Sequence, residues 1–402
     1  MSKLRFGIVK ETRQPPDARV AFSPIQCKEL QTRFPVEIQV QPSEYRIFSD
    51  KDYKEERIPL VEDLSQNDIL FGVKEVQKEF LLSEKTYFFF SHTIKKQPNN
   101  RLMLKRVLDL GIRLIDYECL VDRNGSRLVA FGRFAGVIGA YNGIMMYGLK
   151  HKLFHLERAY KLISVFVIWE QCNRLKLPPI KIAITGSGRV AAGAEETLQA
   201  CQIRKVSPKE FLERKFDGPV YTVLGSSDYH IHKECKTFDR QEFHSNPERY
   251  NSDFMKYAQV TDLLLACAYW NPKAPLLFEL KDMLRPDFYL KAIADVTCDI
   301  NGSIPSTKES STILSPFYDY DPLTDQILPA FSQQDSISVM AVDNLPCELH
   351  RDASIDFGRQ LIDKIIPELF SGDKKGIIDR ATIAINGALT PRYQYLTDYI
   401  NA

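Results

Sequence analysis

The stretch Lys181-Ile-Ala-Ile-Thr-Gly-Ser-Gly-Arg-Val-Ala-Ala-Gly-Ala194 predicts a β-strand, a glycine turn and the beginning of a helix, in that order. Gly186 permits the tight turn, Gly188 lets a phosphate approach the backbone, and Ala191 lets the helix pack closely on the strand. The N–H groups and the positive dipole end of such a helix bind phosphate oxygens. We therefore predict a dinucleotide site rather than a plain tight turn. Its residues are Gly186, Ser187, Gly188, Arg189 and Val190.

Apolar runs at 222–224, 263–267, 292–295 and 337–342 predict that further strands follow this stretch. Strands that alternate with helices are typical of an α/β parallel sheet. The second strand is expected to end near 205–206, where an Asp or Glu would bind the ribose of NAD. The segment 204–209 has the sequence Arg-Lys-Val-Ser-Pro-Lys instead. The missing acid and the nearby cations favour NADP slightly, and NAD stays open.

Two apolar runs in the first quarter of the chain each end at an ionisable residue. Ile69–Val73 is followed by Lys74 and Glu75, and Tyr87–Ser91 is followed by His92. Continuous apolar runs are typical of strands that are covered on both faces in a parallel sheet. In open parallel sheets the chemistry collects beyond the carboxyl ends of the strands. These three ionisable side chains are therefore predicted to form an acid–base group.

The order of strands and helices predicts an α/β fold of two Rossmann-like domains with parallel sheets, joined by long helices around an interdomain cleft. We expect residues 1–134 plus 345–402 to form a substrate domain and residues 135–344 to form a dinucleotide-binding Rossmann domain. Helices are predicted over 23–31, 134–153 and 351–370, and the small residues at 135–143 predict tight helix packing. The tail from 377 to 402 is predicted to be an amphipathic helix with a break at Pro391.

The composition argues against several classes of protein. The 53 Lys and Arg residues balance 52 Asp and Glu residues, so no basic field attracts nucleic acid. No run reaches the ~18 apolar residues that cross a bilayer. The eight cysteines include no CxxC pair, so we expect free thiols and no metal site. Because Met1 leads directly into a predicted strand, we expect no signal peptide and a cytoplasmic location.

The predicted cofactor and the strand-end group fit one kind of chemistry. Reduction of a carbonyl or imine by a nicotinamide requires a group that exchanges a proton near neutral pH. His92 has the right intrinsic pKa, and Lys74 reaches that range when burial or nearby cations lower its pKa. The alternative interpretation of each residue, taken singly, is a structural role.

Nine short stretches, spread over nearly the whole chain, follow the pattern of one known family. They are Phe6–Thr12, Arg19–Ala21, Phe90–Lys95, Leu114–Glu118, Val129–Gly136, Asp295–Ile304, Pro316–Pro322, Val342–Pro346 and Asn386–Leu389. Through them the chain resembles the lysine-forming saccharopine dehydrogenases and, more closely, the lysine–ketoglutarate reductase half of aminoadipic semialdehyde synthases. Both lie within the alanine dehydrogenase and transhydrogenase superfamily. Because the chain ends before a second dehydrogenase would begin, only the reductase step is expected.

The resemblance implies an NAD(P)-dependent condensation of L-lysine with 2-oxoglutarate to saccharopine, or the reverse oxidation. These small molecules are the expected partners, and the protein is expected to be a monomer or a small homo-oligomer. The implied site residues are Lys74 and His92 for proton transfer, Glu75 and Glu118 for tuning their pKa values, Arg19, Lys95 and Arg133 for substrate carboxylates, and Asp295 and Asp299 beside the glycine loop for the cofactor.

Two other functions stay open at this stage. The first is an alanine dehydrogenase-like enzyme or another amino-acid or imine dehydrogenase, against which the stretches His92–Lys95 and Phe131–Arg133 argue. The second is a dinucleotide-binding sensor without turnover, against which the intact pair of Lys74 and His92 argues. The direction of the reaction and the identity of the amine and the keto acid are not decided by the sequence.

Overall fold

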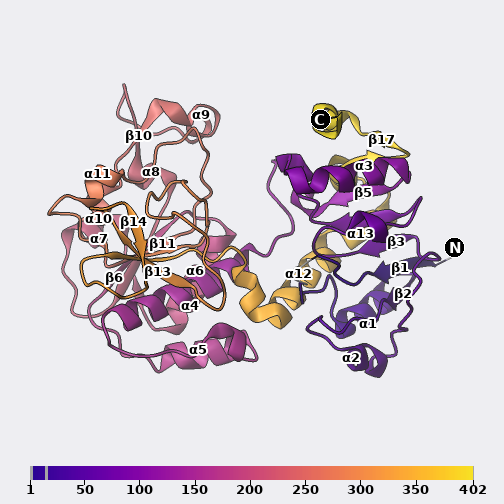
Figure 1. The fold of residues 1–402 in the computed structure, drawn as a ribbon, viewed down its shortest axis with the longest axis horizontal. Helices are drawn as coiled ribbons and strands as arrows, with labels where there is room; N and C mark the ends of the chain where they lie inside the picture. The colour runs from indigo at the N-terminus through magenta and orange to yellow at the C-terminus, as the bar shows by residue number, and fades with distance from the viewer. Residues whose placement is uncertain (1–2, 14–16, 402) are drawn as a thin grey trace. The chain divides into compact units, whose positions relative to one another are not determined.

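The structure is a computed structural model that describes residues 3–13 and 17–401. Contacts between Cα atoms divide the chain into two compact units (Figure 1). The split unit contains the residues up to Phe131 and those from His350 onward, and the central unit contains Gly132–Leu349. The predicted borders, at 134/135 and 344/345, lie a few residues from these positions.

Within the described residues, the split unit is built on a seven-stranded sheet with the order β17-β16-β5-β4-β3-β1-β2. The apolar runs predicted as strands at 69–73 and 87–91 form its buried centre. The first five strands in sequence are parallel to one another. The sixth, β16, is antiparallel to both of its neighbours, β5 and β17. The strands are β1 (Leu4–Ile8), β2 (Val36–Val40), β3 (Ile69–Phe71), β4 (Thr86–Phe89), β5 (Arg113–Asp116), β16 (Thr382–Ile385) and β17 (Ala388–Leu389).

The helices of the split unit begin with α1, where Ser23 is the N-cap and Pro24 opens the first turn. The predicted helix over 351–370 is divided into α12 and α13 next to Pro367. The helices and 3₁₀ turns are α1 (Pro24–Arg33), α2 (Asp50–Glu55), η1 (Lys78–Phe80), η2 (Thr93–Lys95), η3 (Pro98–Asn100), α3 (Arg101–Asp109), η4 (Tyr117–Cys119), α12 (His350–Lys364), α13 (Ile366–Ser371), α14 (Ile377–Ala381), η8 (Pro391–Leu396) and α15 (Thr397–Asn401).

The prediction of a helical tail is wrong over most of its described length. Only the short α14 and α15 are α-helical, and a β-hairpin, β16–β17, lies between them. Asn386 and Gly387 both have positive φ at its turn, which is the geometry that an Asn-Gly hairpin turn requires. The hairpin continues the sheet beside β5, so the two ends of the split unit share one core (Figure 1).

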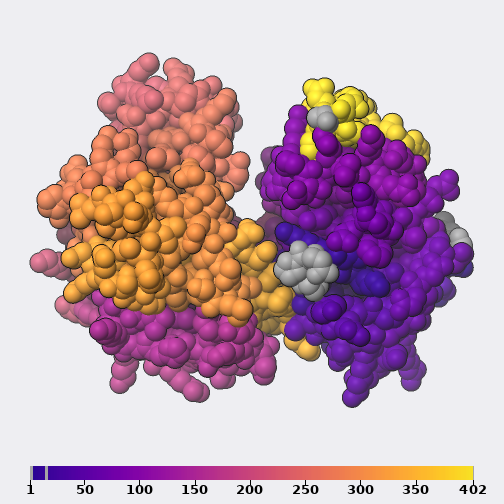
Figure 2. All heavy atoms as spheres, viewed as in Figure 1, coloured from indigo at the N-terminus to yellow at the C-terminus, as the bar shows by residue number. Residues whose placement is uncertain are grey.

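Within the described residues, the central unit is built on an eight-stranded sheet with the order β14-β13-β15-β12-β11-β6-β8-β7. Neighbouring strands are parallel except at β13, which is antiparallel to both β15 and β14; this part of the chain is coloured orange in Figure 2. The strands are β6 (Lys181–Thr185), β7 (Arg204–Lys205), β8 (Val220–Leu224), β11 (Leu263–Ala266), β12 (Ala292–Asp295), β13 (Phe317–Asp321), β14 (Gln326–Leu328) and β15 (Ile337–Met340). A separate antiparallel pair is formed by β9 (His230–His232) and β10 (Tyr250–Ser252).

The helices of the central unit include one long member, α4, which begins two residues before the predicted position. None of the described helices is long and apolar enough to cross a membrane. The helices and 3₁₀ turns are α4 (Gly132–Lys150), η5 (Ala159–Lys161), α5 (Val165–Asn173), α6 (Arg189–Ala200), α7 (Pro208–Glu213), α8 (Ser226–Tyr229), α9 (Arg240–Ser245), η6 (Pro247–Arg249), α10 (Met255–Ala258), α11 (Leu280–Met283) and η7 (Leu345–Leu349).

The small residues of α4 allow it to lie directly against α6. A Cβ added to Gly136 would lie 1.8 Å from the carbonyl oxygen of Val190, and one added to Gly193 would lie 2.0 Å from that of Arg133. The Thr197 hydroxyl donates a hydrogen bond to the Val137 carbonyl at 3.0 Å. Because backbone meets backbone at this contact, the predicted tight packing is confirmed.

Candidate active site

The turn that carries Lys74 is held by the buried carboxyl group of Glu11, which follows the neighbouring strand. Glu11, just beyond β1, accepts hydrogen bonds from the backbone N–H groups of Val73 at 2.7 Å and Lys74 at 2.9 Å. Burial raises the pKa of Glu11 to about 8, and the charge of Asp17 adds to this effect. The two hydrogen bonds fix the direction in which the chain leaves β3. With a pKa of about 8, the Glu11 carboxyl group is mostly protonated at neutral pH.

Lys74 is placed where its amine loses basicity. Burial lowers the pKa of Lys74, and the positive charges of Arg19 and Arg13 lower it further, against the opposing effects of Asp17 and Glu75. A lysine with a lowered pKa is neutral more often near pH 7 and accepts a proton more readily. The assignment of Lys74 to proton transfer stays a prediction.

His92 and Glu75 form a pair at the ends of adjacent strands. His92 Nδ1 lies 3.3 Å from Glu75 Oε2, and Arg13 Nε lies 3.5 Å from Glu75 Oε1. Burial alone would raise the pKa of Glu75, but the hydrogen bond from His92 and the charge of Arg13 lower it overall. The carboxylate therefore stays ionised and orients the imidazole. His92 itself has a left-handed backbone with φ of +53°, which a non-glycine residue rarely adopts outside constrained sites.

Glu118 gathers two cations beside the end of β5. Lys95 Nζ lies 3.1 Å and an Arg127 terminal nitrogen 3.5 Å from Glu118 Oε1. Behind this group, Asp116 accepts hydrogen bonds from the N–H groups of Ser91 and Glu118. Burial raises the pKa of Asp116 to about 6. Asp116 therefore ties the end of β5 to the turn after β4, on which the histidine lies.

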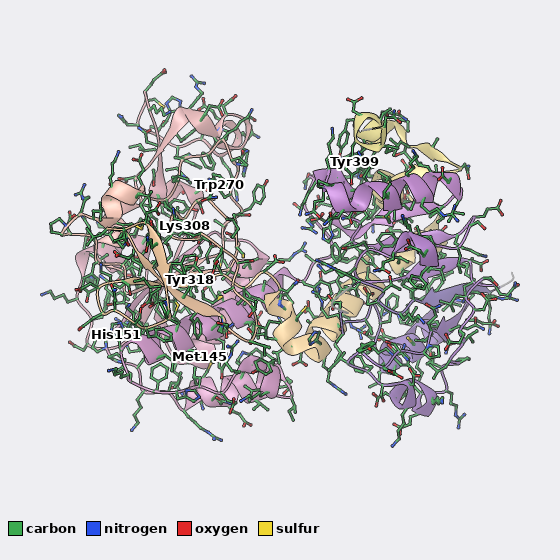
Figure 3. The ribbon with its side chains drawn as sticks, in the orientation of Figure 1. Met145, His151, Trp270, Lys308, Tyr318 and Tyr399 are labelled. Carbon is green, nitrogen blue, oxygen red and sulfur yellow. The ribbon has the colours of Figure 1, made fainter. Side chains whose placement is uncertain are left out.

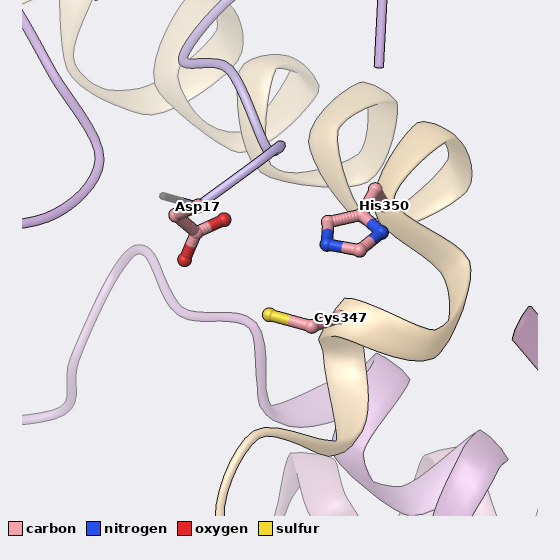
Figure 4. A group of neighbouring side chains, drawn as sticks. All are labelled: Asp17, Cys347 and His350. Atoms are coloured by element: carbon pink, nitrogen blue, oxygen red, sulfur yellow. The ribbon is translucent and has the colours of Figure 1, made fainter. Parts of the chain in front are cut away.

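Arg19 lies in a fork with a buried carboxylate. Its Nε and Nη2 atoms lie 3.0 and 2.6 Å from the Oδ1 and Oδ2 atoms of Asp17. The guanidinium also lies over the Phe131 ring, 4.1 Å from the centroid. Although burial opposes it, the charge of Arg19 lowers the pKa of Asp17 well below its usual range. Figure 4 shows His350 beside Asp17, and burial lowers the pKa of His350.

An aromatic platform brings the predicted side chains of the split unit together. Phe90 stacks on the His92 ring at 6.3 Å and contacts the Phe131 ring at 6.0 Å. Arg127 lies over the Phe90 ring at 6.0 Å, while Arg19 covers the ring of Phe131. The proton-transfer candidate and two cations that suit carboxylates are therefore arranged around one apolar surface.

A pocket of 490 Å³ lies beside Glu11, beyond the ends of β1 and β2. Its lining is mainly acidic, with Glu11, Glu44, Asp50 and Glu62 against the single cation Lys10. The carboxylates of Glu44, Asp50 and Glu62 suit an ammonium group, such as that of an amino-acid ligand.

Sequence reasoning missed Glu11, Asp17, Arg127 and the aromatic platform. Glu11 could have been found, because it follows β1 just as Lys74 follows β3. Asp17 lies two residues before Arg19, a spacing that in a loop permits a local ion pair. Arg127 reaches the site through a turn after β5, and no local pattern in the sequence marks it.

Arg133 belongs to the central unit, whereas the other predicted carboxylate-binding residues belong to the split unit. It begins α4, and its Nε and Nη2 atoms lie 2.7 and 2.6 Å from the Oε1 and Oε2 atoms of Glu196 on α6. The structure thus gives Arg133 a packing role between the two helices, next to the close backbone contact at Gly193.

The glycine loop has the geometry that a pyrophosphate requires. Gly186 has φ of +90°, and a Cβ there would lie 2.9 Å from the Ala268 backbone, so a larger residue does not fit. Gly188 is the N-cap of α6, and a Cβ added to it would meet no described atom within 4 Å. Gly188 therefore leaves space beside the start of the 12-residue α6, which is where a helix of this kind binds phosphate oxygens.

Asp295 ends β12 and holds the loop that follows. It accepts hydrogen bonds from the Thr297 hydroxyl at 2.6 Å and the Thr307 hydroxyl at 2.7 Å, and burial raises its pKa. The hydroxyl of Tyr318, labelled in Figure 3, donates to the Ser306 carbonyl at 2.9 Å and supports the same loop. Asp299, the other predicted cofactor residue, lies within this loop, where its carbonyl accepts from Gly302 N at 2.8 Å.

These features define a class of fold, in which two Rossmann-like α/β units carry a glycine loop on one and an ionisable strand-end cluster on the other. L-alanine dehydrogenase shares it, with a TM-score of 0.62 at 14% identity over 99% of this chain and 100% of that chain. The transhydrogenase from Sinorhizobium meliloti has a TM-score of 0.60 at 13% identity over 96% and 100%. The predicted fold class is confirmed.

The sequence relatives are more specific. Residues 7–138 match the family model of the alanine dehydrogenase/PNT N-terminal domain. Alpha-aminoadipic semialdehyde synthase of Arabidopsis thaliana is 31% identical over 97% of this chain and 41% of its own length, and that of Mus musculus is 32% identical over 94% and 46%. Saccharopine dehydrogenase [NAD(+), L-lysine-forming] of Emericella nidulans is 26% identical over 91% and 92%.

The chain is thus homologous over nearly its whole length to both groups, and the resemblance predicted from the sequence is confirmed. It spans less than half the length of the aminoadipic semialdehyde synthases that it matches.

Proposed function

We propose that this chain catalyses the NAD(P)-dependent joining of L-lysine to 2-oxoglutarate to give saccharopine, or the reverse oxidation. The observation that carries the proposal is Lys74, an amine of lowered pKa, beside the oriented pair of His92 and Glu75. Homology to aminoadipic semialdehyde synthases and lysine-forming saccharopine dehydrogenases supports the choice of substrates.

The split unit is proposed to be the substrate domain, in which proton transfer is the task of Lys74 and His92. Forming an iminium from an amine and a keto acid requires one proton to leave the amine nitrogen and two protons to reach the carbonyl oxygen, which departs as water. Lys74 takes the proton from the nitrogen and returns it to the oxygen, and His92, oriented by Glu75, delivers the second proton to the oxygen. Glu118 holds Lys95 Nζ at 3.1 Å from its Oε1 atom.

Substrate carboxylates are proposed to bind at the cations of this platform. Saccharopine has three carboxylates, and a planar guanidinium binds such groups through two parallel hydrogen bonds. Arg19 lies beside Phe131 and is proposed to bind a carboxylate when its fork with Asp17 opens, and Lys95 offers a point charge. Arg133 is proposed as a third contact, for which its fork with Glu196 has to open.

The central unit is proposed to be the dinucleotide-binding domain, with the loop Gly186–Val190 on the pyrophosphate and the segment Asp295–Asp299 near the nicotinamide. When bound, the nicotinamide supplies or takes the hydride. The chain's own contribution is the open first turn of α6, together with the loop that Asp295 holds through Thr297 and Thr307.

The test follows nicotinamide absorbance at neutral pH with lysine, ornithine or ammonia as the amine and 2-oxoglutarate or pyruvate as the keto acid. Oxidation of the reduced cofactor is expected with lysine and 2-oxoglutarate. Turnover with ammonia and pyruvate only would instead assign an alanine dehydrogenase-like activity, which the fold also suits. Cofactor binding without turnover in any pair would assign a sensor.

A further inference from the structure

The strand beside the glycine loop is β8, although β7 comes first in the sequence. In the usual dinucleotide-binding order, the strand that follows the glycine-loop helix lies directly beside the first strand, and its end contacts the adenosine ribose. Here β6 pairs with β8, and β7 pairs only with the far side of β8. The slight preference for NADP was predicted from the segment Arg204–Lys209. This segment lies one strand farther from the glycine loop than the usual strand order would place it.

The register removes β7 still farther from the carboxyl edge of the sheet. Lys205 pairs with Tyr221, which pairs with Ile182, whereas β6 and β8 run on together to Thr185 and Leu224. Three residues of strand correspond to about 10 Å. Beyond this point Ser207 caps α7, so the chain turns away before it reaches the edge.

The cations of β7 also have other partners. Lys205 Nζ lies 2.6 Å from Glu195 Oε2 on α6, and the Arg204 guanidinium lies 5.2 Å from the centroid of the Phe216 ring. Neither charge is directed by these contacts toward the glycine loop. These two cations therefore give no reason to expect NADP, the cofactor that carries a phosphate on its ribose.

The loop after β8 occupies the place that β7 leaves. The N–H of Gly186 donates a hydrogen bond to the Leu224 carbonyl at 2.8 Å, so Gly225 follows immediately beside the glycine turn. A Cβ added to Gly225 would meet Asp228 Oδ2 at 3.6 Å and Ser227 Oγ at 3.9 Å as its nearest neighbours. A hydrogen bond of 2.7 Å from Gly225 N fixes the Asp228 carboxylate in this position.

We propose that the segment Gly225–Asp228, which comprises the N-cap and the first residues of the short α8 and is called the β8 loop below, contacts the adenosine ribose of the cofactor in place of β7 and selects NAD over NADP. This proposal rests on the dinucleotide function proposed above. Ser227 and Asp228 present a hydroxyl and a carboxylate to the same small space, which is the chemistry that binds a ribose diol. A 2′-phosphate there would meet the negative charge of Asp228 and no Lys or Arg within 225–229.

The test is a calorimetric titration of the full chain with NADH and with NADPH, in the absence of substrates. We expect wild type to bind NADH about tenfold more tightly, or better, because one uncompensated charge contact is of this order. Asp228→Asn keeps an oxygen for Gly225 N and removes the charge, so the preference is expected to fall. Ser227→Arg, at an exposed position, adds a cation and is expected to reverse the preference or abolish it.

Lys205→Ala is the matched control, because it removes a cation at the position that the usual strand order would choose. It is expected to leave the ratio of the two dissociation constants unchanged. Tighter binding of NADPH by wild type, or a ratio that responds to Lys205→Ala and to neither variant of the β8 loop, would overturn the assignment. Failure of both dinucleotides to bind would overturn the proposed function as well. Selective binding that follows the variants of the β8 loop, without turnover of any substrate pair, would support the role of the β8 loop and contradict only the proposed reaction.

Discussion

The strand-end cluster of the split unit and the glycine loop of the central unit solve the problem of placing a ligand in different ways. The cluster consists of ionisable side chains that act on one another, as His92 does when its hydrogen bond lowers the pKa of Glu75. The glycine loop is backbone, and its essential property is the absence of atoms at Gly186 and Gly188. The first region should therefore be sensitive to changes of charge at constant shape, and the second to added volume at constant charge.

The largest effect is expected from removing both proton-transfer groups of the cluster. Lys74→Met with His92→Gln should lower kcat by about 10³–10⁴, because positioned acid–base groups typically contribute factors of this kind. The dissociation constant of the dinucleotide should stay within about twofold, since both residues lie in the other unit. Steady-state kinetics and calorimetry on one preparation check both expectations. Turnover that survived the double change would show that the acid–base assignment is wrong.

The converse change is made in the glycine loop. Gly186→Ala should weaken dinucleotide binding about 10- to 100-fold, because the new Cβ meets the Ala268 backbone and the positive φ disfavours alanine. Gly218→Ala is the matched control, since a Cβ there would meet no described atom within 4 Å. Fluorescence titration with the reduced cofactor measures both variants. Equal affinities for the two would contradict the placement of the loop.

A smaller effect should come from a change at constant charge within the cluster. Arg19→Lys keeps the positive charge and loses the fork that Asp17 now fills. We expect KM for the keto acid to rise about tenfold with a smaller change in kcat, as for a lost bidentate contact. Arg33→Lys, on the exposed end of α1, serves as a control that should change neither constant. An unchanged KM in Arg19→Lys would remove this residue from the carboxylate site.

The smallest effect concerns stability and pH. Because the folded pKa of Glu11 is raised to about 8 from 4.5, its protonated form stabilises the fold fully below about pH 4.5. This contribution is lost as pH rises through about 8. Glu11→Gln cannot titrate, so the stability of wild type relative to this variant should decrease over that range by about 1 kcal/mol, discounted for partial exposure. Urea unfolding at pH 5 and pH 8.5 measures the change, and a relative stability that increased with pH would contradict the raised pKa.

Much of the fold could be predicted because it depends on local pattern. The apolar runs at β3, β4 and β6 and the Ser23 cap of α1 are properties of a few adjacent residues, and all are present where predicted. The prediction for the tail was wrong because its apolar residues suit a helix as well as a strand. The Asn386-Gly387 turn favours the hairpin over the helix.

What the sequence could not show is which elements lie side by side. The exchange of β7 and β8 in the sheet is a lateral order that neither strand encodes alone. The same holds for Glu11, whose partners Val73 and Lys74 are 62 and 63 residues away along the chain. Residue types at strand ends therefore predicted the side chains of the candidate site, whereas the partners of these side chains required the structure.

The contact of α4 with α6 has a consequence for how this scaffold can diversify. With backbone against backbone at Gly136 and Gly193, no side-chain layer separates the two helices, so none is available to be repacked by mutation. Any new tilt of α6, and with it of the turn that faces the phosphates, has to be accompanied by an equal movement of α4. Relatives that keep small residues at both positions should hold this turn in one place, and they are then free to vary only the loops around it.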